Sequence, residues 1–123
     1  MLKFMRKGEI LRGLKIQDEW IRKILSGEKT MEVRSRRYDV LGQRIALGNS
    51  GNGLVEGYVT VQEIVEIPLA QIPTYENKHL ATKWLLKQYR SKEVLYGYCL
   101  TKVKKENKPL SFTKSGSIMF TLE

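Results

Sequence analysis

A series of short β-rich runs, separated by turn-forming residues, is the feature that most limits the possible folds of this chain. The clearest turn is residues 49–53, Asn-Ser-Gly-Asn-Gly, because asparagine and glycine tolerate the positive φ that tight turns require. It separates residues 44–47 from a long run at 54–64, in which Gly57 indicates a bulge or a close approach of another backbone. Further runs with strand character are residues 11–16, 30–35, 94–103 and 117–122. The chain is therefore expected to contain about six strands.

Two segments are expected to form helices outside the strands. The first is residues 18–26, with Asp18 as its N-cap and Gly27 as its stop. The second is residues 78–89, with Trp84 on its buried side. Strands that are joined mainly by turns favour an α+β fold, namely a mixed, partly closed β-barrel of about six strands with two or more flanking helices.

The chain of 123 residues has the length of a single domain, and no linker-like segment divides it. We expect a flexible basic arm at residues 1–9 and one domain at residues 10–123. Cys99 is the only cysteine and His79 the only histidine, so the chain lacks the means for an internal disulfide or a zinc site. The sequence therefore predicts no metal and no cofactor.

The positive charge of the chain is concentrated toward its two ends. The net charge is +9, with +6 in residues 1–37, −4 in residues 38–77 and +7 in residues 78–123. This asymmetry favours a polyanionic partner, and nucleic acid more than a membrane, because no strongly amphipathic basic helix is present. The alternative is a basic protein without such a partner. No stretch approaches about 18 apolar residues or has the pattern of a signal peptide, so the expected location is the cytoplasm.

Three charged residues follow the first expected helix closely. Lys29 stands at the entry to the strand at 30–35, and Glu32 and Arg34 share one face of that strand with Thr30. Unpaired charges buried in a core cost several kcal/mol each, so we expect this set to face solvent or a polar pocket. The alternative is an exposed Glu32–Arg34 pair worth about 0–1 kcal/mol.

The spacing Gly27-x-Lys29-x-x-Glu32-x-Arg34 resembles the G-x-K-x-x-E-x-R signature of the ASCH family, in the wider PUA-like group. Its surroundings are similar as well: a helix reading Trp-Ile-Arg-Lys-Ile-Leu-Ser-Gly precedes it, and strands reading Gly-Gln-Arg-Ile-Ala-Leu and Val-Glu-Gly-Tyr-Val-Thr-Val follow it. The resemblance covers residues 12–123.

Two positions depart from the family pattern. Glu19 stands where a proline often precedes the helix tryptophan, which affects the entry to the helix rather than the chemistry. Tyr98 takes the place of the tryptophan in the family's Tyr-Gly-Trp, which would weaken stacking there.

The resemblance implies a PUA-like barrel whose cleft is lined by the signature residues, in a protein that acts on RNA as a binding module or a small hydrolase. One branch of the family deacetylates N4-acetylcytidine with a lysine, a threonine and a glutamate. Lys29 matches that lysine, but Glu32 stands at the threonine position. Other members are described as ribonucleases.

The first hypothesis is a module that binds RNA, another single-stranded nucleic acid or a modified nucleoside. A base would stack on Tyr98 or Trp20, although Trp20 is more typical of a core residue, and Glu32 and Arg34 would read its edge. Lys29 and Thr30 complete the expected pocket. The candidate phosphate contacts are Arg36, Arg37, Lys102, Lys104, Lys105 and Lys108.

The second hypothesis is an amidohydrolase or ribonuclease with Lys29, Glu32 and Arg34 as catalytic residues. Lys29 would act as a base with a lowered pKa, Glu32 would hold the lysine or activate water, and Arg34 would stabilise an oxyanion. The sequence contains no G-x-S-x-G motif, metal-ligand cluster or phosphate loop, which excludes the commonest hydrolase classes. A third hypothesis is an accessory protein that recognises a partner protein through its acidic middle segment. The base, its modification, RNA versus DNA and the oligomeric state stay open.

Overall fold

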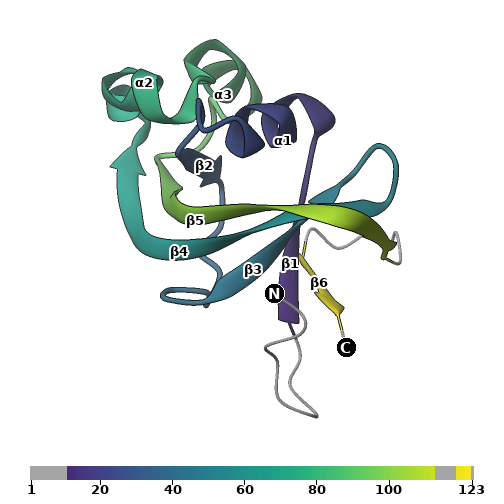
Figure 1. Ribbon diagram of the computed structural model, residues 1–123. Coiled ribbons are helices and arrows are strands. Elements are labelled where there is room, and N and C mark those ends of the chain that lie inside the picture. The colour runs from purple at the N-terminus through teal and green to yellow at the C-terminus, as the bar shows by residue number, and fades with distance from the viewer. Residues whose placement is uncertain (1–10, 113–118, 123) are drawn as a thin grey trace.

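The computed structural model describes residues 11–112 and 119–122, which form one six-stranded sheet and several short helices (Figure 1). The elements in chain order are β1 (Leu11–Ile16), α1 (Asp18–Leu25), β2 (Met31–Arg34), β3 (Arg44–Asn49), β4 (Leu54–Pro68), η2 (Leu69–Tyr75), α2 (Glu76–His79), α3 (Thr82–Gln88), β5 (Val94–Ser111) and β6 (Met119–Leu122). The expected arm at residues 1–9 lies outside the described residues. No helix in the described part of the chain is long and apolar enough to cross a membrane.

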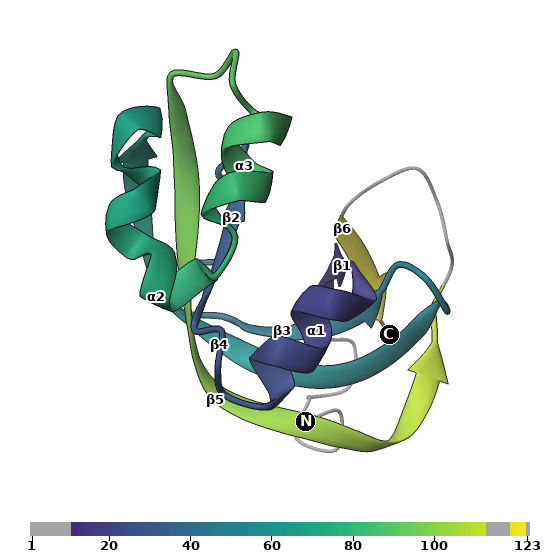
Figure 2. The ribbon, with the colours of Figure 1, turned by 90° about the horizontal axis from the view of Figure 1, so that it is seen from above.

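The sheet has the strand order β2-β5-β4-β3-β1-β6. β1 and β3 run parallel and the other neighbours run antiparallel, so the sheet is mixed and the α+β class is confirmed. Two strands are longer than expected, because β4 continues to Pro68 and β5 to Ser111. Both bend strongly along their length, as Figure 2 shows, and the register between them shifts three times.

Gly57 marks one of these register shifts and lies where another backbone comes close, as its position in the run predicted. A Cβ atom on Gly57 would stand 2.7 Å from Leu25 Cδ2 and 2.8 Å from the carbonyl oxygen of Lys104. The absence of a side chain therefore lets the end of α1 and the middle of β5 approach the same point on β4.

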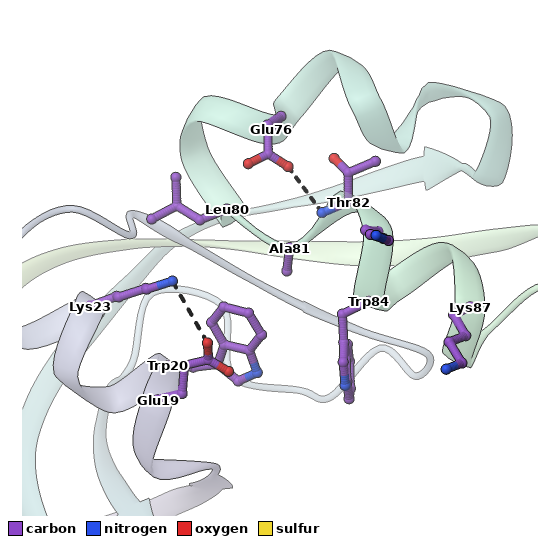
Figure 3. A pocket seen from close by; sticks show the side chains of 10 residues that line it. Glu19, Trp20, Lys23, Glu76, Leu80, Ala81, Thr82, Trp84 and Lys87 are labelled. Carbon is purple, nitrogen blue, oxygen red and sulfur yellow. Dashed lines mark hydrogen bonds and ion pairs between the residues drawn. The ribbon is translucent and has the colours of Figure 1, made fainter.

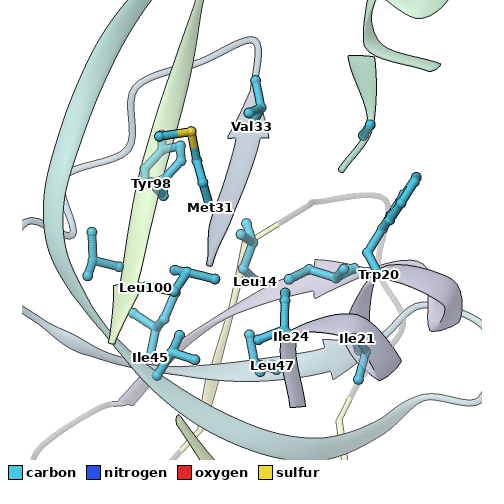
Figure 4. Close-up of a cluster of buried hydrophobic side chains, with 14 of the residues drawn as sticks. Leu14, Trp20, Ile21, Ile24, Met31, Val33, Ile45, Leu47, Tyr98 and Leu100 are labelled. Carbon is cyan, nitrogen blue, oxygen red and sulfur yellow. The ribbon is translucent and has the colours of Figure 1, made fainter. Parts of the chain in front are cut away.

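Helix α1 covers the core with an apolar face made of Trp20, Ile21 and Ile24 (Figure 4). Its acidic first turn and basic last turn complement the helix dipole. The expected N-cap was wrong by one residue: Gln17 is the N-cap, and Asp18 is the first helical residue. The Asp18 carboxylate instead accepts a hydrogen bond from Asn49 Nδ2 at 2.8 Å, which ties α1 to β3.

The second expected helix, residues 78–89, is divided between the end of α2 and α3, and η2 precedes both. The break falls at Leu80, which has φ 62°, and the backbone N–H of Ala81 donates to His79 Nδ1 at 2.9 Å instead of continuing a helical ladder. The break also changes which side chains are buried. Leu85 is 2% exposed, but Trp84, expected on the buried side, is 37% exposed and does not belong to the core.

Candidate functional site

Lys29, Glu32 and Arg34 meet in the interior between α1, β2 and α2. Lys29 is 2% exposed and Glu32 is 5% exposed. Lys29 Nζ lies 3.4 Å from Glu32 Oε1, while Nε and Nη2 of Arg34 both lie 2.7 Å from Glu32 Oε2. The carboxylate therefore stands between two cations, which form a buried cluster that we call the Lys29–Glu32–Arg34 cluster.

The burial of Lys29 differs from the expected exposure to solvent or a polar pocket. Its ammonium donates a hydrogen bond to the carbonyl oxygen of His79 at 2.6 Å and lies 5.0 Å from the centre of the Trp20 ring. Burial lowers the pKa of Lys29, while the charge of Glu32 opposes that shift. The interior accepts these charges because they are paired and hydrogen-bonded rather than isolated.

The other predicted site residues are distributed over several places. Thr30 is exposed, and its backbone N–H donates to the Lys78 carbonyl at 2.9 Å. Arg36 and Arg37 are exposed in the segment after β2. Tyr98 is 2% exposed and offers no surface for stacking. Its hydroxyl accepts from the Tyr38 backbone N–H at 2.8 Å and donates to the Arg36 carbonyl.

A pocket of about 500 Å³ lies between α1 and the segment that contains α2 and α3 (Figure 3). The side chains that matter for its chemistry are Trp20, Lys23, Glu76, Lys83, Trp84 and Lys87. Of the predicted site residues only Trp20 lines it. The Lys29–Glu32–Arg34 cluster lies behind the pocket wall, where Lys29 adjoins the Trp20 ring.

The two tryptophans of the pocket differ in what their rings can still contact. They pack edge to face, with ring centres 6.3 Å apart and an angle of 67° between the planes. Trp20 is 8% exposed, and its ring lies 5.1 Å from Lys23 Nζ as well as 5.0 Å from Lys29 Nζ. Trp84 is 37% exposed and meets Tyr89 edge to face at 6.1 Å. Trp84 is therefore the aromatic side chain that the pocket presents to a ligand.

The charges around Trp84 favour an anionic ligand. Lys23 pairs with Glu19 at 3.9 Å, and Glu76 accepts from the Thr82 backbone N–H at 3.0 Å (Figure 3). Hydrogen bonds from Thr82 lower the pKa of Glu76, so this carboxylate is ionised at neutral pH. Lys83 and Lys87 stand one turn apart on α3, and neither makes an ion pair within the described residues. Like charges at this spacing repel, and an anion placed between them would relieve the repulsion.

Sequence reasoning missed Trp84, Lys83 and Lys87 as site residues. Helical periodicity assigned Trp84 to the core, and only the break at Leu80 leaves it at the surface. The signal that could have found the three residues is local: a tryptophan flanked by lysines at adjacent and i+3 positions, which is a common composition for nucleic-acid contacts. Lys102 and Lys104 lie on the outer half of β5 and do not line the pocket. In the described part of the chain, no group of three or more His, Cys, Asp or Glu residues could hold a metal ion.

Buried His79 predicts a pH dependence of stability. The ring is 0% exposed, Nδ1 accepts from Ala81, and Nε2 therefore carries the proton that it donates to the Ile72 carbonyl at 2.8 Å. Burial, reinforced by the Lys29 charge, lowers the pKa of His79 below its usual value of 6.5. Between the folded-state pKa and about pH 6.5 the unfolded chain binds more protons, so stability is complete above that range and falls as the pH decreases through it.

We expect His79→Gln, which has no titrating ring, to flatten the dependence of unfolding free energy on pH between pH 5 and 7. Urea unfolding at several pH values measures the slope. Parallel profiles for the wild type and the variant would contradict this account of His79.

The family model of the ASCH domain matches residues 14–109. The crystal structure of ASCH from Zymomonas mobilis aligns with a TM-score of 0.77 at 19% identity, over 91% of this chain and 87% of that chain. A serine-to-alanine mutant of the same Zymomonas mobilis protein aligns with a TM-score of 0.78 at 18% identity, over the same shares of the two chains. No curated protein matches the chain significantly in sequence.

Proposed function

Because this chain belongs to the ASCH domain family, we propose that it binds single-stranded RNA or a modified nucleoside in the pocket between α1 and α3. One observation carries the proposal. Trp84 is 37% exposed at the pocket and stands between Lys83 and Lys87, which have no acidic partners among the described residues. A base can stack on the accessible ring while the neighbouring phosphate contacts the unpaired cations.

Each part of the pocket has a role in this proposal. The base stacks on Trp84, and Lys83 and Lys87 contact the adjacent phosphates. The ionised carboxylate of Glu76 accepts hydrogen bonds from an exocyclic amino group of the base. Bases in a duplex are stacked and paired, so the pocket favours single strands, loops and ends.

The Lys29–Glu32–Arg34 cluster supports this pocket from behind. Lys29 contacts the Trp20 ring and the carbonyl of His79, so it connects α1 with the end of α2. Arg34 donates from β2 to the Lys15 carbonyl on β1 at 2.7 Å, although three strands separate β2 from β1 in the sheet order. This bond supports the proposal that the sheet curls into a partly closed, PUA-like barrel over residues 10–123.

A small RNA-directed hydrolase is the second candidate, favoured by the environment of Lys29. An amine with a lowered pKa that touches a carboxylate is a common arrangement for a general base. In that mechanism the neutral Lys29 would take a proton, Glu32 would orient it, and Arg34 would stabilise the negative oxygen that forms. Trp20 separates these groups from the pocket, so a substrate would have to displace its ring.

One set of measurements tests both candidates. Binding of fluorescent single-stranded RNA and of a matched duplex is followed by anisotropy at several salt concentrations. We expect the single strand to bind more tightly, and Lys83→Gln/Lys87→Gln to reduce the salt slope of its affinity by about 1.4. The control is Arg90→Gln/Lys92→Gln, which removes the same charge outside the pocket lining.

The same preparations are incubated with N4-acetylcytidine, with Lys29→Gln as the variant. Salt-dependent binding without turnover supports the binding module, whereas turnover that Lys29→Gln abolishes supports the hydrolase. Equal affinities for single strand and duplex, together with an unchanged slope in the Lys83/Lys87 variant, would overturn the proposed pocket.

A further inference from the structure

The outer half of β5 carries a second group of exposed cations. Four lysines, which we call the β5 lysine stripe, are exposed along this strand: Lys102, Lys104, Lys105 and Lys108. Glu106 is the single carboxylate among them. It already accepts from the Tyr58 hydroxyl at 2.7 Å and from the Lys108 backbone N–H at 3.2 Å, and these bonds lower its pKa. Glu106 is therefore ionised, and with it the four lysines leave the stripe a net charge of +3.

The backbone of the stripe is held in an uncommon conformation. Lys102 has φ 52°, which residues other than glycine adopt rarely and at an energetic cost. Its carbonyl accepts a hydrogen bond from the Arg44 guanidinium, which also donates to Thr60 Oγ1 at 3.2 Å. The register between β4 and β5 shifts opposite this point, between Tyr58 and Thr60. Contacts with β3 and β4 therefore hold the backbone of β5 in place at Lys102.

Helix α1 runs from the pocket to the middle of β5, where Lys105 stands opposite Gly57 in the register. Trp20 and Lys23 on this helix line the pocket, whereas Leu25 near its end lies against Gly57, at the point that the Lys104 carbonyl also approaches. Trp20 and Leu25 are separated by about 7.5 Å along the helix axis, from the rise per residue. None of the stripe lysines lines the pocket, so a ligand that contacts both must extend beyond the pocket.

We propose that the ligand is a polynucleotide strand rather than a free nucleoside, and that it continues from the pocket past the end of α1 onto the β5 lysine stripe. This inference rests on the proposed function and specifies its ligand. The exposed lysines along β5 offer several cations to successive phosphates of such a strand. An alternative role of these lysines is to keep the exposed edge of β5 from pairing with a strand of another molecule. In that case their removal would leave RNA binding unchanged.

The test measures affinity as a function of RNA length. Single-stranded RNAs of two, four, eight and twelve nucleotides are titrated into the wild type and into Lys104→Gln/Lys108→Gln, with Arg90→Gln/Lys92→Gln as the charge-matched control. Thermal unfolding verifies that the variants are folded. We expect the dinucleotide to bind all three proteins equally. For the longest RNA we expect the stripe variant to lose the gain in affinity with length and about 1.4 of the salt slope.

Separate results identify separate failures. Weaker dinucleotide binding by a Trp84 variant would support the pocket. A Trp84 variant with the dinucleotide affinity of the wild type would overturn the proposed function. A stripe variant with the length dependence and salt slope of the wild type would overturn this inference while the pocket stands. Displacement of the RNA by polyglutamate at equal affinity would also overturn it, because the stripe would then recognise an acidic chain of any kind.

Discussion

Replacing Glu32 with glutamine is expected to lower the free energy of unfolding by about 3–5 kcal/mol, because the substitution leaves the buried Lys29 ammonium without its counter-charge. The carboxylate also interacts with Nε and Nη2 of Arg34, so the substitution deprives two cations of the partner that they share. Urea unfolding followed by circular dichroism measures the change. Glu19→Gln is the matched control, because Glu19 pairs with Lys23 at the surface and should contribute about 0–1 kcal/mol.

The double variant Lys29→Met/Glu32→Gln separates burial of an unpaired charge from loss of packing. We expect it to recover part of the stability that Glu32→Gln loses, since it removes the charge of Lys29, the more deeply buried of the two cations, and leaves only Arg34, whose side chain is 14% exposed. A cost for Glu32→Gln as small as that for Glu19→Gln would contradict the buried cluster.

Replacing Trp84 with alanine is expected to weaken single-stranded RNA binding about 5- to 150-fold, the range that corresponds to 1–3 kcal/mol of stacking on one base. The salt slope should stay unchanged, because no cation is removed. Part of the stability should also be lost, because the ring packs edge to face against Trp20 and Tyr89, so thermal unfolding verifies that the variant is folded. Trp84→Phe should keep most of the affinity, because it keeps an aromatic face.

Leu41→Ala is the matched control for Trp84→Ala, since Leu41 is an exposed apolar side chain, 53% exposed, that does not line the pocket. It should leave RNA affinity unchanged. If the two substitutions changed RNA affinity equally, Trp84 would not be part of the binding site.

Much of the fold could be predicted because its signals are local. The β-rich run at residues 30–35 predicted a strand, and β2 forms at Met31–Arg34. Gly57 predicted an irregular register, and the register shifts there. The family match and the mixed six-stranded sheet confirm the resemblance and the mixed α+β class.

The site was harder to predict because its contacts are not local. The spacing of Lys29 and Glu32 indicated that they belong together, but nothing near them in sequence indicated burial. That burial depends on the His79 carbonyl, 50 residues away, whose position follows from the break at Leu80. The burial of Tyr98 also depends on distant residues. Its hydroxyl is hydrogen-bonded to the backbone at Arg36 and Tyr38, about 60 residues earlier in the chain.

The two tryptophans of the chain report directly whether a base enters the pocket beside Trp84. The indole N–H signals of Trp20 and Trp84 can be assigned in a ¹H–¹⁵N NMR spectrum with the Trp84→Phe variant. During titration with a short single-stranded RNA, we expect the Trp84 signal to shift most and saturably, with a smaller change at Trp20. Saturable RNA binding that leaves both indole signals in place would contradict the account.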